Sequence, residues 1–221
     1  GREEEEIRTF ERALREVPED KKSRIYGRLG DYYYYRLDYE KSVENYLKAI
    51  ELETDEWQLY LHEKNLAQPY YLAGEYEKAK EHAKKALEYF YKSGYEEENY
   101  LAYTSRSATR LSQFGWLYLC LGEKEKAKQY FEKMDQVPPC RFCEYKKCYE
   151  GVVNLGRYYA SIGEYEKALE MLEEAVREAK PDADVKAFRK QSELLSSFET
   201  NLLETASFGG GAKGAKGGSK A

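Results

Sequence analysis

The chain has 221 residues, of which 42% are hydrophobic and 35% are charged, and this composition excludes a wholly disordered protein. The formal net charge of −5 argues against a general nucleic-acid binder, which needs a basic face to neutralise phosphates. Apolar runs stay far below the roughly 18 residues that cross a bilayer, and no targeting segment opens the chain. We therefore expect a soluble, cytoplasmic protein without a nucleic-acid or membrane partner.

The first segment, residues 1–22, contains an amphipathic stretch. Ile7, Phe10, Ala13 and Leu14 recur at helical spacing between charged residues. This pattern predicts a helix that packs against the array of elements that follows it.

Residues 23–181 contain an internal repeat with four copies. Each copy has two apolar-periodic stretches of about 12 to 15 residues separated by a turn signal, which predicts a helix, a tight turn and an antiparallel helix. Small residues stand where the two helices would cross. The copies contain the pairs Leu29-Gly30, Leu66-Ala67, Phe114-Gly115 and Leu155-Gly156, followed by the turn segments Asp38-Tyr39-Glu40-Lys41, Gly74-Glu75-Tyr76-Glu77-Lys78-Ala79, Gly122-Glu123-Lys124-Glu125-Lys126-Ala127 and Gly163-Glu164-Tyr165-Glu166-Lys167-Ala168.

A single helix pair cannot bury its own apolar face, whereas stacked pairs can. The expected fold is therefore all-α, an α-solenoid of stacked antiparallel helix pairs that wind into a right-handed superhelix. On the motifs quoted above, residues 23–181 resemble the tetratricopeptide repeat family. The resemblance implies a scaffold that binds proteins or peptides, because this is how the family is used.

The sequence departs from the family pattern at three places. Leu37 stands where the turn glycine is expected, and Pro69 lies inside a predicted helix. Gly74 and Gly122 are 48 positions apart, against about 34 residues in an ordinary repeat. We interpret the extra residues as lengthened helices around Ser93-Gly94, one of them running from Glu96 to Cys120.

Two segments follow the repeats. Residues 182–208 carry apolar side chains at helical spacing and predict an amphipathic closing helix that covers the end of the array. Residues 209–221 are rich in glycine and lysine and predict a flexible tail. This tail is either a linker or tag remnant, or a displayed peptide that a modifying enzyme acts on.

No nucleotide-binding loop, catalytic triad signature or zinc-protease helix occurs in the sequence, so we expect no enzymatic activity and no obligatory cofactor. His62 and His82 fall on predicted helices without a neighbouring nucleophile, and we interpret them as structural or surface residues.

Three cysteines form the only pattern that suggests a metal. Cys140, Cys143 and Cys148 have the spacing C-x2-C-x4-C, and thiols at this spacing can hold zinc or an iron-sulfur cluster if another group completes the site. Unmetallated thiols and a redox pair are the alternatives. Cys120 is expected at the far end of its helix and is interpreted as buried.

The inner wall of the superhelix is the predicted binding surface, because the first helix of every repeat faces it. Tyrosine, tryptophan and arginine dominate binding hot spots, although several aromatic residues here could instead pack against neighbouring helices. Gly27 and Asp31 replace the lysine and asparagine with which relatives clamp a chaperone's terminal carboxylate. The predicted groove residues are Arg24, Asp31, Tyr34, Tyr35, Lys64, Gln68, Tyr71, Leu72, Ser112, Trp116, Leu119, Asn154, Arg157 and Ala160.

The leading hypothesis is a non-enzymatic scaffold that binds an extended or helical peptide in this groove. One alternative is a zinc, iron-sulfur or redox module built on the three cysteines. The other is a carrier or precursor whose tail is the substrate of a modifying enzyme. The sequence leaves the partner and the oligomeric state open.

Overall fold

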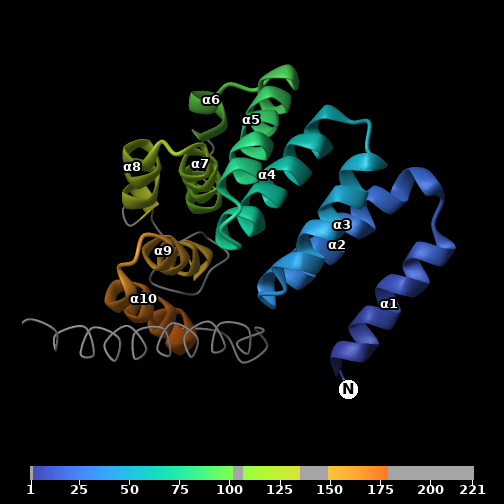
Figure 1. The fold of residues 1–221 in the computed structure, drawn as a ribbon, viewed down its shortest axis with the longest axis horizontal. Helices are drawn as coiled ribbons and strands as arrows, with labels where there is room; N and C mark the ends of the chain where they lie inside the picture. The colour runs from blue at the N-terminus through green and yellow to red at the C-terminus, as the bar shows by residue number, and fades with distance from the viewer. Residues whose placement is uncertain (1, 102–106, 135–148, 179–221) are drawn as a thin grey trace, which may run out of the picture. The chain divides into compact units, whose positions relative to one another are not determined.

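The computed structural model describes residues 2–101, 107–134 and 149–178, and all regular elements in these ranges are helical (Figure 1). The chain divides into two compact units, residues 1–155 and 156–221. The elements are α1 (Arg2–Glu16), a 3₁₀ turn η1 (Glu19–Lys21), α2 (Lys22–Tyr35), α3 (Tyr39–Glu51), α4 (Glu56–Leu72), α5 (Tyr76–Lys92), α6 (Glu97–Leu101), α7 (Ser107–Leu121), α8 (Lys124–Met134), α9 (Tyr149–Ser161) and α10 (Tyr165–Glu178).

Helical hairpins stack in sequence order in the first unit. α2 pairs with α3, α4 with α5 and α7 with α8, and successive hairpins touch through α3 with α4 and α5 with α7 (Figure 1). The first helices of neighbouring hairpins, α2 with α4 and α4 with α7, also touch each other. This arrangement confirms the predicted all-α solenoid of stacked helix pairs.

The small residues predicted at the helix crossings meet large side chains of the partner helix. A Cβ atom at Gly30 would lie 2.7 Å from the Tyr46 ring, and one at Gly115 would lie 2.8 Å from the Phe131 ring. In the second unit, a Cβ atom at Gly156 would lie 2.9 Å from Leu172. The ring or aliphatic group of the second helix therefore occupies the space that a side chain on the first would need.

The turn inside each pair has the same backbone conformation. Gly74, Gly122 and Gly163 have φ values of 82°, 82° and 84°, in the left-handed region where glycine is favoured. Leu37 holds the equivalent place in the first pair with φ of 62°. The turn geometry is thus retained at Leu37 despite the cost of a left-handed backbone for a residue with a side chain.

A lysine on the second helix lies over a tyrosine ring on the first in each pair, which links the two helices just beyond the turn. The same contact recurs in all four pairs, with the ammonium nitrogen 3.7 to 5.3 Å from the ring centroid. The pairs are Lys41 with Tyr33, Lys78 with Tyr70, Lys126 with Tyr118 and Lys167 with Tyr159.

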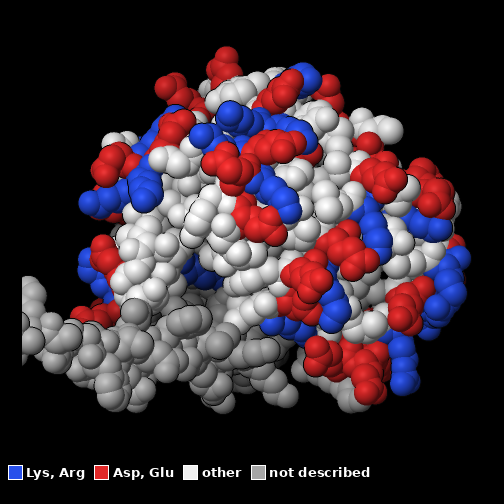
Figure 2. Space-filling view, viewed as in Figure 1, with Lys and Arg blue, Asp and Glu red and all other residues white. Residues whose placement is uncertain are grey.

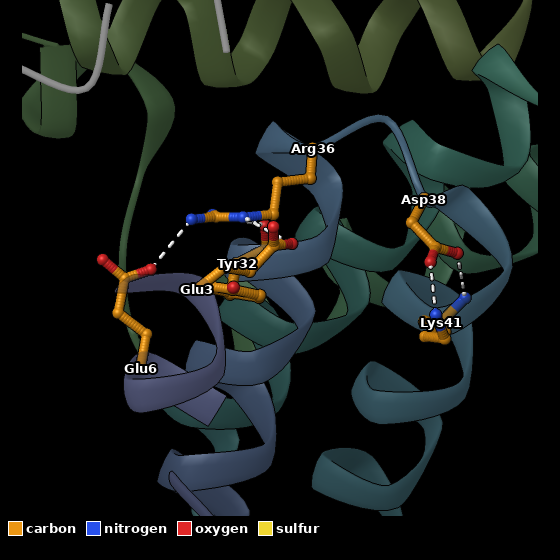
Figure 3. Close-up of polar contacts among 6 residues, drawn as sticks. All are labelled: Glu3, Glu6, Tyr32, Arg36, Asp38 and Lys41. Atoms are coloured by element: carbon orange, nitrogen blue, oxygen red, sulfur yellow. Dashed lines mark hydrogen bonds and ion pairs between the residues drawn. The ribbon is translucent and has the colours of Figure 1, made fainter. Parts of the chain in front are cut away.

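The N-terminal helix α1 packs on α2, as its apolar spacing predicted. Phe10 lies edge-on to the Tyr32 ring, with the two centroids 5.8 Å apart. The guanidinium of Arg36 lies 3.6 Å from the centroid of the Tyr32 ring and donates to Glu6 at 2.8 Å (Figure 3). A second carboxylate of α1, that of Glu3, lies 3.5 Å from the same guanidinium (Figure 3). An aromatic contact and two ion pairs therefore hold α1 in place.

The extra residues between the second and third repeats form a different structure from the one predicted. α5 ends at Lys92, Gly94 adopts a left-handed φ of 78°, and α6 spans only Glu97–Leu101 before α7 begins at Ser107. Residues 102–106 lie outside the described residues, so the predicted helix from Glu96 to Cys120 is described only in part. Arg110 of α7 donates to the carbonyl oxygen of Tyr100 at 2.6 Å, although ten residues of one continuous helix span about 15 Å, so the prediction of a single helix is wrong.

Pro69 lies inside α4 and does not interrupt the helix. The helix continues to Leu72, and the Pro69 carbonyl accepts a hydrogen bond from the amide of Ala73 at 2.9 Å. Proline lacks only the N–H group, so its carbonyl still takes part in the last helical turn.

Candidate functional site

The predicted groove residues of the first two repeats lie on α2 and α4, which touch each other. Hydrogen bonds between side chains join the two helices. Tyr34 Oη donates to Gln68 Oε1 at 3.0 Å, and Asn65 Nδ2 donates to Asp31 Oδ1 at 3.3 Å. The two first helices therefore form one connected surface.

Asp31 is the centre of the polar part of this surface. It accepts a hydrogen bond from Tyr46 Oη of α3 at 2.5 Å in addition to the bond from Asn65. Burial raises the pKa of the Asp31 carboxyl above its ordinary value, and burial also raises the pKa of Tyr46. Sequence reasoning selected Asp31 as a groove residue but missed its partners Tyr46 and Asn65, which bind it from two other helices.

Tyrosines border this surface at the end of α2 and α4 that precedes the turns. Tyr35 is 41% exposed, and its ring lies 5.5 Å from that of Tyr34. Tyr71 is half-buried between Tyr76 and Trp116, with ring centroids 5.1 and 6.3 Å away. These contacts hold the rings in place while leaving part of each accessible.

The predicted groove residues of α7 are buried. Ser112 is 4% exposed, and Trp116 and Leu119 are each 1% exposed. The Trp116 ring packs edge-on against Phe131 of α8, with the two centroids 5.9 Å apart, and so fills space between α7 and α8. In this structure a partner cannot touch these three side chains, which corrects their placement on an accessible wall.

Several other predicted groove residues are also buried, and a smaller set stays accessible. Tyr34, Lys64 and Arg157 are 7%, 5% and 6% exposed. Asn154 and Ala160, both on α9, are half-buried. On α2 and α4, six predicted side chains are exposed or half-buried, and we call this set the inner wall: Arg24, Asp31, Tyr35, Gln68, Tyr71 and Leu72.

Each of the two histidines lies beside a carboxylate. His62 is buried, and its Nε2 atom lies 4.0 Å from Glu53 Oε2, while Ser23 Oγ donates to the same carboxylate oxygen. His82 Nδ1 lies 2.6 Å from Glu63 Oε2. Because Ser23 donates to the carboxylate instead of to the imidazole, the group is not a nucleophile and base pair.

Cys120 is the one cysteine within the described ranges. Cys120 is buried with its Sγ atom 3.6 Å from the Ala67 carbonyl, and burial raises the pKa of its thiol, as expected for an inert core cysteine. Cys140, Cys143 and Cys148 lie outside the described residues, as do the predicted closing helix 182–208 and the tail 209–221. Within the described ranges, no group of three His, Cys, Asp or Glu side chains could hold a metal. None of the described helices has both the length and the apolar character needed to span a membrane.

Sequence models of the tetratricopeptide repeat match three segments, residues 23–56, 108–138 and 153–180. The matched segments include α2 with α3, α7 with α8, and most of α9 with α10. The chain contains tetratricopeptide repeats. Such repeats generally mediate protein–protein interaction and are typically non-catalytic.

Two further comparisons were made, with curated proteins and with solved structures. No curated protein matches the sequence. Among solved structures, this repeat protein is similar to BtubC (BKLC) from P. vanneervenii, with 18% identity, a TM-score of 0.43 and coverage of 97% of this chain and 92% of that one.

Proposed function

We propose that this repeat protein is a non-enzymatic scaffold that binds an extended or helical peptide of a protein partner on its inner wall. The observation that supports this most directly is the row of partly accessible aromatic, aliphatic and amide side chains along α2 and α4, two helices that touch and are hydrogen-bonded to each other. Backbones of such helices are rigid, so the side chains are presented in a constant arrangement.

The inner wall combines anchors with polar groups. Tyr35, Tyr71 and Leu72 supply apolar contact area, and tyrosine does so at low entropic cost because it has few rotatable bonds. Asp31 and Gln68 supply hydrogen-bonding groups between these anchors. Tyr71 is already packed against other rings, so peptide binding costs little additional side-chain entropy at this residue.

The charge distribution on the surface supports a protein partner over a nucleic acid. Figure 2 shows acidic and basic side chains intermingled over the visible face, and they are not separated into fields of one sign. Many are local ion pairs, such as Lys48 with Glu44 and Lys85 with Glu81. A mixed surface of this kind does not concentrate positive charge for phosphates.

Selection of a random twelve-residue peptide library on the full chain, followed by fluorescence anisotropy of the selected peptides, tests this proposal. The variant carrying Tyr35→Ala and Tyr71→Ala should bind the selected peptides at least about tenfold more weakly, because two anchors are removed. Circular dichroism of this variant verifies that the helices remain.

Tyr91→Ala is the matched control, because Tyr91 is 51% exposed and lies on α5 outside the inner wall. It should leave peptide affinity unchanged. Selected peptides that bind the double variant as tightly as the parent would show that the inner wall is not their site.

A further inference from the structure

The first unit contains a hollow that shares no residue with the inner wall. Its volume is about 420 Å³, within the range of roughly 300 to 1,000 Å³ typical of ligand pockets. It lies among the start of α4, the segment after α5, the short helix α6 and the start of α7. The residues that line it are Trp57, Tyr95, Asn99, Tyr100, Thr109, Arg110 and Gln113.

The extra residues between the second and third repeats build part of this hollow. Tyr95, Asn99 and Tyr100 all belong to the stretch between α5 and α7. A repeat of ordinary length, about 34 residues, has no room for this stretch. The insertion therefore contributes binding groups to the hollow besides connecting two hairpins.

One wall of the hollow is aromatic and firmly supported. Trp57 lies 4.6 Å from Tyr95 and 5.9 Å from Tyr100 between ring centroids. Behind them, the fully buried Phe90 contacts Tyr95 at 5.8 Å and Tyr100 at 5.3 Å. Tyr95 is nevertheless 44% exposed, so a flat apolar group can pack on this wall without displacing it.

The α7 residues that line the hollow carry mainly hydrogen-bond donors. Gln113 Oε1 accepts a hydrogen bond from Tyr100 Oη at 3.1 Å, which turns the amide so that its remaining function is donation. The guanidinium of Arg110, which has donors only, lies 4.4 Å over the Tyr100 ring and is held there by its bond to the Tyr100 carbonyl. The indole N–H of Trp57 can likewise donate a hydrogen bond but cannot accept one.

The surroundings of the hollow do not favour an acidic ligand. Asn99 Nδ2 donates to Glu96 Oε2 at 2.9 Å, and Tyr118 Oη donates to Glu97 Oε2 at 2.8 Å, so two carboxylates lie on the same segment as the lining residues. The ligand that fits is therefore neutral, has a flat apolar face and presents acceptors.

We propose that this hollow binds a proline-rich peptide segment in the polyproline II conformation. Prolyl rings are flat and apolar, and proline has no N–H group, so such a segment presents carbonyl acceptors only. With three residues per turn, prolines at i and i+3 share one edge, which packs on the aromatic wall while intervening carbonyls accept from α7. Domains that recognise this conformation likewise dock it on aromatic side chains.

Titration of the full chain with octaproline, followed by tryptophan emission and isothermal calorimetry, tests the proposal. The sequence contains two tryptophans, and Trp116 is buried, so a change in emission reports mainly on Trp57. Octaproline should bind saturably, an eight-residue Gly-Ser peptide should not, and raising the salt from about 50 to 500 mM should leave the affinity unchanged because the ligand is neutral.

Variants locate the site. Tyr95→Ala and Gln113→Ala should each weaken octaproline binding by about tenfold, because one removes an exposed ring and the other a donor. Tyr91→Ala, which removes an exposed ring outside the hollow, should not change it.

The proposal would be overturned by no saturable binding of octaproline, by equal binding of the Gly-Ser peptide, or by tighter, salt-sensitive binding of an octaglutamate peptide. The inner-wall variant with Tyr35→Ala and Tyr71→Ala should keep full octaproline affinity. Loss of affinity in that variant would place the ligand on the inner wall and also overturn this assignment, whereas failure of the library selection leaves this experiment unaffected.

Discussion

The first and second hairpins contact each other through polar side chains. The second and third hairpins contact each other through aromatic rings. Between α2, α3 and α4, polar side chains such as Asp31, Tyr46 and Asn65 bond to one another across the helices. Around α5, α6 and α7, the fully buried Phe90 and Phe114 pack against tyrosine rings.

This difference shows that stacking geometry does not require one type of interior. The polar contact depends on every donor and acceptor being satisfied, since an unsatisfied buried group costs roughly 1 to 3 kcal/mol. The aromatic contact depends on volume and shape, since an emptied site loses many close contacts at once. The first should therefore respond to pH and to removal of single hydroxyls, and the second to truncation of rings.

The largest effect is expected from Phe90→Ala. Phe90 is fully buried and contacts Tyr60, Tyr100 and Phe114 at about 5.2 to 5.3 Å between ring centroids. Removing the ring should lower the free energy of unfolding by about 3 to 5 kcal/mol, measured by urea denaturation. Tyr91→Ala, one residue later and half exposed, should cost less than about 1 kcal/mol. Equal costs for the two would contradict the aromatic core described here.

A smaller loss is expected from Tyr46→Phe in the polar contact. The variant keeps the ring against Gly30 but removes the hydroxyl that donates to Asp31. The Asp31 carboxylate then loses its bond from Tyr46 and keeps the bond from Asn65, and the free energy of unfolding should fall by about 1 to 3 kcal/mol. Tyr76→Phe removes a hydroxyl from an exposed ring and should change stability by less than about 0.5 kcal/mol. A loss from Tyr46→Phe no greater than this control would argue against the bond to Asp31.

The pH dependence should separate the two contacts further. Burial lowers the pKa of His62 below its ordinary value of 6.5, although Glu53 opposes this shift. The unfolded chain therefore binds a proton at higher pH than the folded chain, so stability should fall as the pH drops below about 6.5 toward the folded pKa. Urea denaturation of the parent and His62→Gln from about pH 7.5 to 5 should show the parent losing stability faster. If the stability of the parent and of His62→Gln fell in parallel with pH, His62 would not be the cause of the loss.

The smallest effect concerns the turns. Leu37→Gly should raise the free energy of unfolding by up to about 1 kcal/mol, because it relieves a left-handed backbone at a residue with a side chain. Gly122→Ala should lower it by about 1 kcal/mol, since nothing lies within 4 Å of the added carbon and only the backbone is strained. Thermal denaturation of the two variants measures both changes in stability. If both variants gained stability, or both lost it, the turn conformation shared by Leu37 and Gly122 would be contradicted.

Much of the fold could be read from repeated local signals. The Leu-Gly, Tyr and Gly-Glu-Tyr pattern located the helix pairs, the small residues at Gly30 and Gly156 marked their crossings, and the apolar spacing of residues 7–14 placed a helix on the first repeat. The segment around Gly94 was harder, because its helical periodicity continues across a glycine whose φ of 78° ends the pattern, and α6 is held by Arg110 from the next helix.

The candidate site was recovered only in part for the same reason. Counting along each first helix placed Tyr35, Gln68 and Tyr71 on an accessible wall, but it placed Trp116 there too, and that ring is enclosed by Phe131 and Tyr71. The hollow beside Trp57 and Arg110 had no motif, since its residues come from four separate segments.

Periodicity is a property of neighbouring residues, so the amino-acid order alone was enough to establish helices, hairpins and their stacking. Burial depends on which distant side chains meet, so the accessible part of the wall, the Asp31 network and the aromatic hollow emerged only once the helices were packed against one another.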